Sequence, residues 1–240
     1  MEPTKVGKVD KRALLCLTCG KPTPIEPCVR CGARASVPRD FARKGAPPQS
    51  LLDICREKRR EPEEPLVTRS RLFAACGGRV DRGSLVTVGG NRGEGKTTLA
   101  LEAAASFGEG VLWVDGEMKA TQLGDVAERL KLRPAAMRRI ERLEARTSKA
   151  TRGAMRASRR GIVVIDSFHA VTRSDAERDE FAEWLHKDAA REGRVIIVLT
   201  RYSKDGTVRG SGSIEYWGDA CLAVEGFKAY VDGKCRWFGG

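Results

Sequence analysis

The chain has 240 residues, of which 41% are hydrophobic and 32% charged, enough for one α/β domain with a small appendage but not for two full domains. No stretch approaches the roughly eighteen apolar residues of a membrane span, and the basic N-terminus lacks the apolar segment of a secretory signal, so we expect a cytoplasmic protein. The formal net charge of +12 favours a polyanionic partner.

The first feature along the chain is a pair of CxxC motifs, Cys16-Leu-Thr-Cys19 and Cys28-Val-Arg-Cys31, each followed by glycine. Each motif turns two thiolates toward one cation, and four sulfurs close a tetrahedral shell without an open position. Residues 1–34 are therefore predicted to form a structural Zn²⁺ module, with an iron–sulfur site or a redox pair as the alternative. The other cysteines are scattered, and we expect free thiols at Cys55, Cys76, Cys221 and Cys235.

Residues 35–65 are predicted to be a linker, because prolines and mixed charge occur there without apolar periodicity. From residue 66 onward, short apolar runs alternate with amphipathic stretches. This pattern predicts an α/β domain over residues 66–240, with a mostly parallel sheet covered by helices.

The predicted strands of this sheet are the apolar runs at residues 84–88, 111–114, 162–165, 195–199 and 220–224. The predicted helices cover residues 96–107, 121–132 and 175–191, the last capped by Ser174 with Glu177 three residues on. Residues 231–233, Val-Asp-Gly, predict the turn of a terminal hairpin.

Basic residues gather in two blocks, because residues 1–60 have a net charge of +8 and residues 135–160 a net charge of +7. Two blocks on an otherwise slightly acidic chain favour contact with nucleic acid, and a solvated surface is the alternative.

Residues 90–97, Gly-Asn-Arg-Gly-Glu-Gly-Lys-Thr, match the GxxxxGK(S/T) pattern of a phosphate-binding loop between a predicted strand and a predicted helix. Lys96 is expected to neutralise the β- and γ-phosphates, and the Thr97 hydroxyl to ligate Mg²⁺. The predicted nucleotide-binding residues are Gly90, Asn91, Arg92, Gly93, Glu94, Gly95, Lys96, Thr97 and Thr98.

Two carboxylates complete the predicted catalytic site beside Lys96. Asp166 ends the run 162–165 and is expected to stand at the carboxyl edge of the sheet as the second ligand of Mg²⁺. Glu117 follows the run 111–114 and is expected to orient or deprotonate the attacking water, with a plain surface loop residue as the alternative. Asp115 is the weaker candidate, because it lies within the strand end.

Together these segments resemble the RadA (Sms) branch of the bacterial RecA-like ATPases. That family has a four-cysteine zinc finger, a phosphate loop and a strand that ends in Gly-Glu. Residues 163–167 resemble its Walker B strand, and residues 203–206, Ser-Lys-Asp-Gly, its segment after the fourth strand. Residues 234–239, Lys-Cys-Arg-Trp-Phe-Gly, resemble its Lys-Asn-Arg-Phe-Gly motif with one extra residue and cysteine in place of asparagine.

The resemblance implies a RecA-like core, a hexameric ring, DNA binding and ATP-driven movement along DNA in recombination or repair. It also implies that Lys234 and Arg236 couple a DNA-facing surface to ATP, with Lys204 at a subunit boundary; two ordinary basic residues on an edge strand are the alternative. The family's C-terminal Lon-protease-like domain has no counterpart here, so a short phage or mobile-element relative fits as well.

We therefore expect a DNA-dependent ATPase that uses ATP, Mg²⁺ and Zn²⁺. The alternative is a regulatory or accessory RecA-like ATPase whose zinc module docks a protein partner and whose hydrolysis ignores DNA. A primase–helicase fragment is less well supported, because the sequence has no carboxylate cluster suited to nucleotide polymerisation.

Overall fold

The computed structural model describes residues 14–16, 22–23, 36–38, 64–202 and 213–237, and the chain divides into two compact units, Met1–Pro62 and Glu63–Gly240. In the first unit, three short antiparallel strands have the order β2-β1-β3, with bounds β1 (Leu14–Cys16), β2 (Pro22–Thr23) and β3 (Ser36–Pro38). Cys19, Cys28 and Cys31 lie outside the described residues, as does the side chain of Cys16, so the zinc site remains a prediction.

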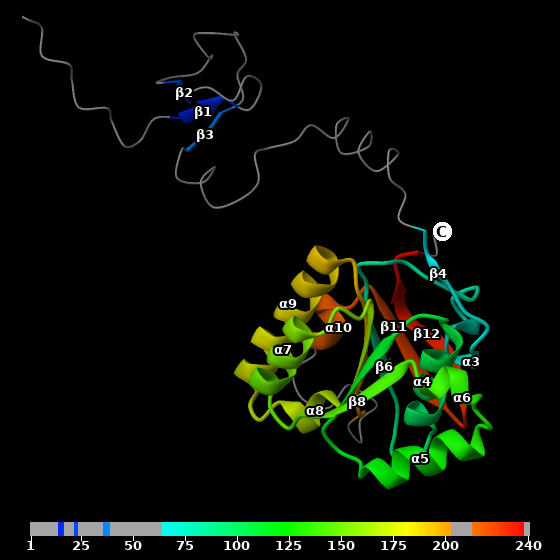
Figure 1. The fold of residues 1–240 in the computed structure, drawn as a ribbon. Coiled ribbons are helices and arrows are strands. Elements are labelled where there is room, and N and C mark those ends of the chain that lie inside the picture. The colour runs from blue at the N-terminus through cyan, green and yellow to red at the C-terminus, as the bar shows by residue number, and fades with distance from the viewer. Residues whose placement is uncertain (1–13, 17–21, 24–35, 39–63, 203–212, 238–240) are drawn as a thin grey trace, which may run out of the picture. The chain divides into compact units, whose positions relative to one another are not determined.

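The second unit is built on a seven-stranded sheet with the order β12-β11-β6-β10-β9-β7-β8 (Figure 1). All neighbouring strands are parallel except β11 and β12. The predicted mostly parallel sheet is confirmed. Its strands are β6 (Leu85–Gly89), β7 (Val111–Asp115), β8 (Ile140–Glu144), β9 (Ile162–Asp166), β10 (Val195–Leu199), β11 (Ala220–Glu225) and β12 (Lys228–Cys235).

Helices cover both faces of this sheet, because alternate residues of its buried strands feed two separate apolar cores. One core packs α3 (Arg71–Ala74), α4 (Lys96–Ser106) and α5 (Ala120–Arg129) against the sheet. The other packs α7 (Ser148–Ala157), α8 (Phe168–Val171), α9 (Asp175–Glu192) and α10 (Ser213–Trp217). The remaining elements are α6 (Pro134–Met137), β4 (Leu66–Val67) and β5 (Arg79–Val80).

The three predicted helices are confirmed as α4, α5 and α9, and the Ser174 hydroxyl accepts a hydrogen bond from the Glu177 backbone N–H, as the capping pattern requires. Strand β8 and helix α7 were not predicted, because both fall in the basic block at residues 135–160. β8 is an edge strand with the sequence Ile-Glu-Arg-Leu-Glu, in which Ile140 and Arg142 are half-buried and the other three residues are exposed, so it lacks the apolar run of the central strands.

The predicted position of the terminal hairpin turn is wrong. The turn between β11 and β12 is Gly226-Phe227, where both residues have positive φ, as a two-residue type I′ turn requires. Residues 231–233 lie inside β12, where Gly233, at φ 77°, accompanies a shift in the pairing with β11. The Asp-Gly pair therefore marks a strand irregularity, and the true turn uses a phenylalanine where glycine or asparagine is usual.

Among the described residues, no helix has the length and apolar character needed to cross a membrane.

Candidate active site

The predicted phosphate loop connects the end of β6 to the start of α4 at the carboxyl edge of the sheet. Gly95, the residue before α4, has a φ of 98°, and a Cβ there would collide with the Phe227 ring. Gly90 has a φ of 152°, and a Cβ there would meet the Val224 carbonyl oxygen. Both positions therefore need glycine for conformation and for space.

Lys96 opens α4 and folds back over this loop. Its ammonium donates hydrogen bonds to the Gly90 and Asn91 carbonyl oxygens, both at 2.7 Å. Burial lowers the pKa of Lys96 below its usual value, the charge of Asp166 opposes this shift, and Arg201 adds to it. A partly desolvated ammonium at the mouth of such a loop is well placed to meet phosphate oxygens.

The next residue, Thr97, donates a hydrogen bond from its hydroxyl to Asp166 Oδ2 at 2.8 Å. Asp166 ends β9 at the carboxyl edge of the sheet and is buried. Burial raises the pKa of Asp166 to about 6; the Thr97 hydrogen bond opposes this rise, and the charge of Asp115 adds to it.

This hydroxyl–carboxylate pair fits a Mg²⁺ ion, which prefers hard oxygen ligands and a buried charge to neutralise. In the part of the chain that the structure describes, no cluster of three or more His, Cys, Asp or Glu side chains is arranged to hold a metal. A Mg²⁺ ion at a nucleotide site takes one or two protein ligands and completes its shell with phosphates and water.

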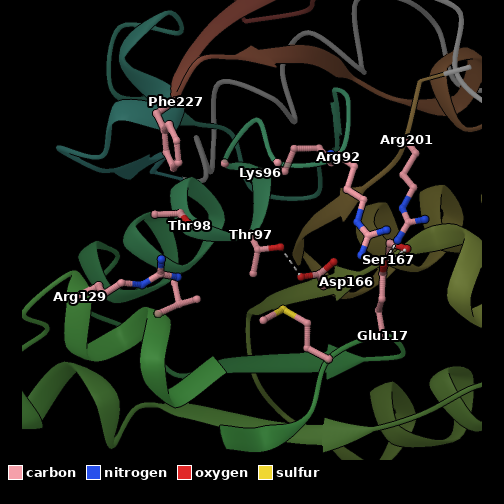
Figure 2. A pocket seen from close by; sticks show the side chains of 14 residues that line it. Arg92, Lys96, Thr97, Thr98, Glu117, Arg129, Asp166, Ser167, Arg201 and Phe227 are labelled. Atoms are coloured by element: carbon pink, nitrogen blue, oxygen red, sulfur yellow. Dashed lines mark hydrogen bonds and ion pairs between the residues drawn. The ribbon is translucent and has the colours of Figure 1, made fainter. Parts of the chain in front are cut away.

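Glu117 follows β7, and its carboxylate contacts two residues that come after other strands of the sheet. Ser167, next to Asp166, donates a hydrogen bond to Glu117 Oε2 at 3.0 Å, and the Arg201 guanidinium forms an ion pair with Oε1 (Figure 2). The Asp115 carboxylate is buried and stabilises the turn after β7. It accepts hydrogen bonds from the backbone N–H groups of Glu117 and Met118 and forms an ion pair with Arg142.

One cavity of about 300 Å³ unites these groups. Glycines and side chains of the phosphate loop line it together with Glu117, Asp166 and Arg201, and Thr98, Arg129 and Phe227 line it as well. A cavity with two carboxylates, an ammonium and three guanidinium groups around a glycine-rich loop is suited to binding a polyphosphate and a cation.

No protein-family model matches the chain. Curated relatives are similar over most of it. The DNA repair protein RadA of Bacillus subtilis is 26% identical over 241 residues, 90% of this chain and 52% of that protein. RadA of Pseudomonas aeruginosa is 28% identical over 248 residues (94% and 53%), and RadA of Listeria monocytogenes 30% identical over 182 residues (71% and 38%).

The chain is a RadA-like member of the RecA superfamily. It spans about half the length of the curated RadA proteins that it matches.

The basic residues that the RadA resemblance singled out lie away from this cavity or outside the described residues. Lys204 lies outside the described residues. Lys234 donates a hydrogen bond to the Tyr216 carbonyl oxygen at 3.1 Å, and Arg236 pairs with the buried Asp219 at 2.8 Å. In the RadA-like core each of the two side chains thus has an intrachain partner.

The predicted site lacks six residues that line the cavity of the RadA-like core, namely Met118, Val126, Arg129, Ser167, Arg201 and Phe227. Arg201 and Ser167 had a usable signal, because each follows a predicted parallel strand at the edge where Asp166 was expected. Arg129 and Phe227 had no such signal. Arg129 is an arginine at the end of α5 that belongs to no motif, and Phe227 lies in a turn that was predicted at other residues.

Replacing Asp166 with asparagine should stabilise the RadA-like protein at pH 8 when neither metal nor nucleotide is present. The folded-state pKa is raised, so ionisation costs stability as the pH rises from about 4 through 6, and asparagine avoids a cost of about 2–3 kcal/mol while still accepting the Thr97 hydrogen bond. Urea unfolding in EDTA should show the gain at pH 8 and little of it near pH 4. A less stable variant at pH 8 would contradict this electrostatic account.

Proposed function

We propose that the chain is a Mg²⁺-dependent ATPase whose hydrolysis is coupled to DNA. ATP hydrolysis is supported by one observation: Lys96, the Thr97–Asp166 pair and Glu117 line one cavity at the carboxyl edge of the parallel sheet. Phosphoryl transfer needs positioning and charge stabilisation more than covalent chemistry, and these four side chains supply both.

Each residue has a distinct part in this mechanism. Lys96 exchanges its two carbonyl partners for the β- and γ-phosphates of ATP and offsets the charge that develops on them. Thr97 and Asp166 would hold Mg²⁺, which supplies further charge stabilisation at the phosphates when bound. Glu117 accepts the proton of the attacking water, oriented by the hydroxyl of Ser167.

Arg201 is the cation that pairs with Glu117 in this site. Both carboxylate oxygens of Glu117 are engaged, one by Ser167 and the other by Arg201. The γ-phosphate of bound ATP competes for the guanidinium, because phosphate and carboxylate suit the same planar donor. Glu117 is then released toward water when ATP binds.

The DNA half of the proposal rests on the RadA relatives and on charge. In the basic block at residues 135–160, Arg142, Arg152 and Arg160 form ion pairs within the chain. Other basic side chains of this block are exposed and suited to phosphate contacts, namely Arg138, Lys149, Arg156 and Arg159. The net charge of +12 supports the same partner.

The wider RadA-like properties belong to the proposal as well. We propose that Cys16, Cys19, Cys28 and Cys31 bind one structural Zn²⁺, that the protein assembles as a homo-oligomer such as a hexameric ring, and that it acts in the cytoplasm in DNA repair or recombination. Metal analysis of the purified protein tests the first of these, with about one zinc per chain as the expected result.

Steady-state ATP hydrolysis with and without single-stranded DNA tests the coupling. We expect a several-fold stimulation at low salt that disappears as salt rises, since phosphate contacts release counterions. Hydrolysis that ignores DNA at every salt concentration would instead favour the accessory ATPase whose zinc module docks a protein. No hydrolysis under any condition would refute the ATPase assignment itself.

A further inference from the structure

The end of the cavity away from Asp166 carries a feature that phosphate chemistry does not use, an aromatic ring open to solvent. Phe227 forms the β11–β12 turn, is 48% exposed and lines the same cavity as Lys96 and Thr98. Its φ of 61° is a left-handed conformation that a bulky side chain rarely adopts. A strained, exposed aromatic residue at a cavity is more often retained for a ligand than for packing.

The phosphate loop itself holds this ring in place. The Phe227 backbone N–H donates to the Glu94 carbonyl oxygen at 3.0 Å, and the Gly226 N–H donates to the Glu94 carboxylate. The ring also lies against Gly95, where any side chain would collide with it. The turn is thus fastened to the loop at three points, and the ring has a fixed place relative to bound phosphates.

Thr97 lies between two ends of the cavity that differ in their lining residues. Asp166 and Glu117 lie on one side of it, and Phe227 and Arg129 lie on the other (Figure 2). In the proposed function the γ-phosphate and the attacking water occupy the Asp166–Glu117 side. The sugar and base of the nucleotide must therefore leave at the opposite side, where the phenylalanine ring and the arginine guanidinium are found.

We propose that the base of the bound nucleotide stacks on the Phe227 ring, with the Arg129 guanidinium covering its other face. This assignment rests on the proposed function and extends it to recognition of the nucleoside. A flat π-system between an aromatic ring and a guanidinium plane gains dispersion and cation–π attraction, most for the larger surface of a purine. The affinity of this site for ATP then includes a contribution that phosphates alone do not give.

The test compares Mg²⁺-ATP with Mg²⁺-tripolyphosphate, which has the phosphates but no base, by calorimetric titration of the full chain. Phe227→Gly removes the ring and keeps the positive φ. It should raise the Kd for ATP about 10-fold and leave the Kd for tripolyphosphate unchanged, whereas Phe227→Tyr should retain wild-type affinity for both. Arg129→Gln should weaken ATP binding about 3-fold with no effect on tripolyphosphate.

Tyr230→Ala, which removes another exposed aromatic residue from the same hairpin, is the matched control and should change neither Kd. Equal losses for ATP and tripolyphosphate in Phe227→Gly would mean that the ring only props the phosphate loop, and an unchanged Kd for ATP would remove it from binding; either result overturns the inference and leaves the proposed function standing. If the wild-type chain binds neither probe, the proposed function fails, and the inference fails with it.

Discussion

Replacing Lys96 with alanine is expected to lower ATP hydrolysis by about 100-fold or more. This ammonium lies at the loop, 2.7 Å from each of two backbone carbonyl oxygens that we expect it to exchange for phosphate. Burial lowers the pKa of Lys96, so part of its hydration is lost before nucleotide arrives, and less remains to be lost on binding. Steady-state phosphate release at saturating ATP is the measurement.

Lys187→Ala is the matched control for this loss. It removes an ammonium of the same type from an exposed site on α9, paired with Glu183 outside the cavity, and should keep wild-type turnover. Zinc content should be the same in both variants, because the predicted zinc ligands and the phosphate loop share no residue. If Lys96→Ala hydrolyses ATP as fast as the wild type, the active site lies elsewhere.

Much of the site was predictable because a parallel sheet has only one carboxyl edge. Once residues 162–165 and 84–88 are recognised as buried parallel strands, Asp166 and the phosphate loop must end at that edge together. The hydrogen bond between Thr97 and Asp166 follows from this topology. Arg201 follows β10 and lies at the same edge of the sheet for the same reason. It was not predicted because it belongs to no recognised motif.

Other features were not predictable, because tertiary contacts decide them. Three of the five residues of β8 are charged, as in a surface loop, and only its pairing with β7 at the edge of the sheet makes it a strand. Phe227 occupies a turn position where local preference disfavours it, and the hydrogen bonds from the Gly226 and Phe227 backbone N–H groups to Glu94 link residues more than a hundred positions apart. The basic block looked like one surface, yet Arg142 is used inside the fold to hold Asp115.

Glu117→Gln is expected to lower kcat by about 100- to 10,000-fold while the Kd for ATP changes little, because the amide keeps the shape of the side chain and loses its ability to accept a proton. Single-turnover hydrolysis and equilibrium binding separate the two effects. Hydrolysis near the wild-type rate would make Glu117 a surface carboxylate that merely pairs with Arg201.

Arg201→Ala in the Glu117→Gln background distinguishes two roles of the arginine. If Arg201 acted only by holding Glu117, the double variant would match Glu117→Gln, since nothing remains to be held. Arg201 also lowers the pKa of Lys96, so its charge acts on the phosphate end of the cavity, and we expect it to contact the γ-phosphate once that group binds. The double variant should then be about 10-fold slower than Glu117→Gln alone, as expected for the loss of one charged hydrogen bond to the transferring group. Equal rates in the two variants would mean that Arg201 acts only through its contact with Glu117.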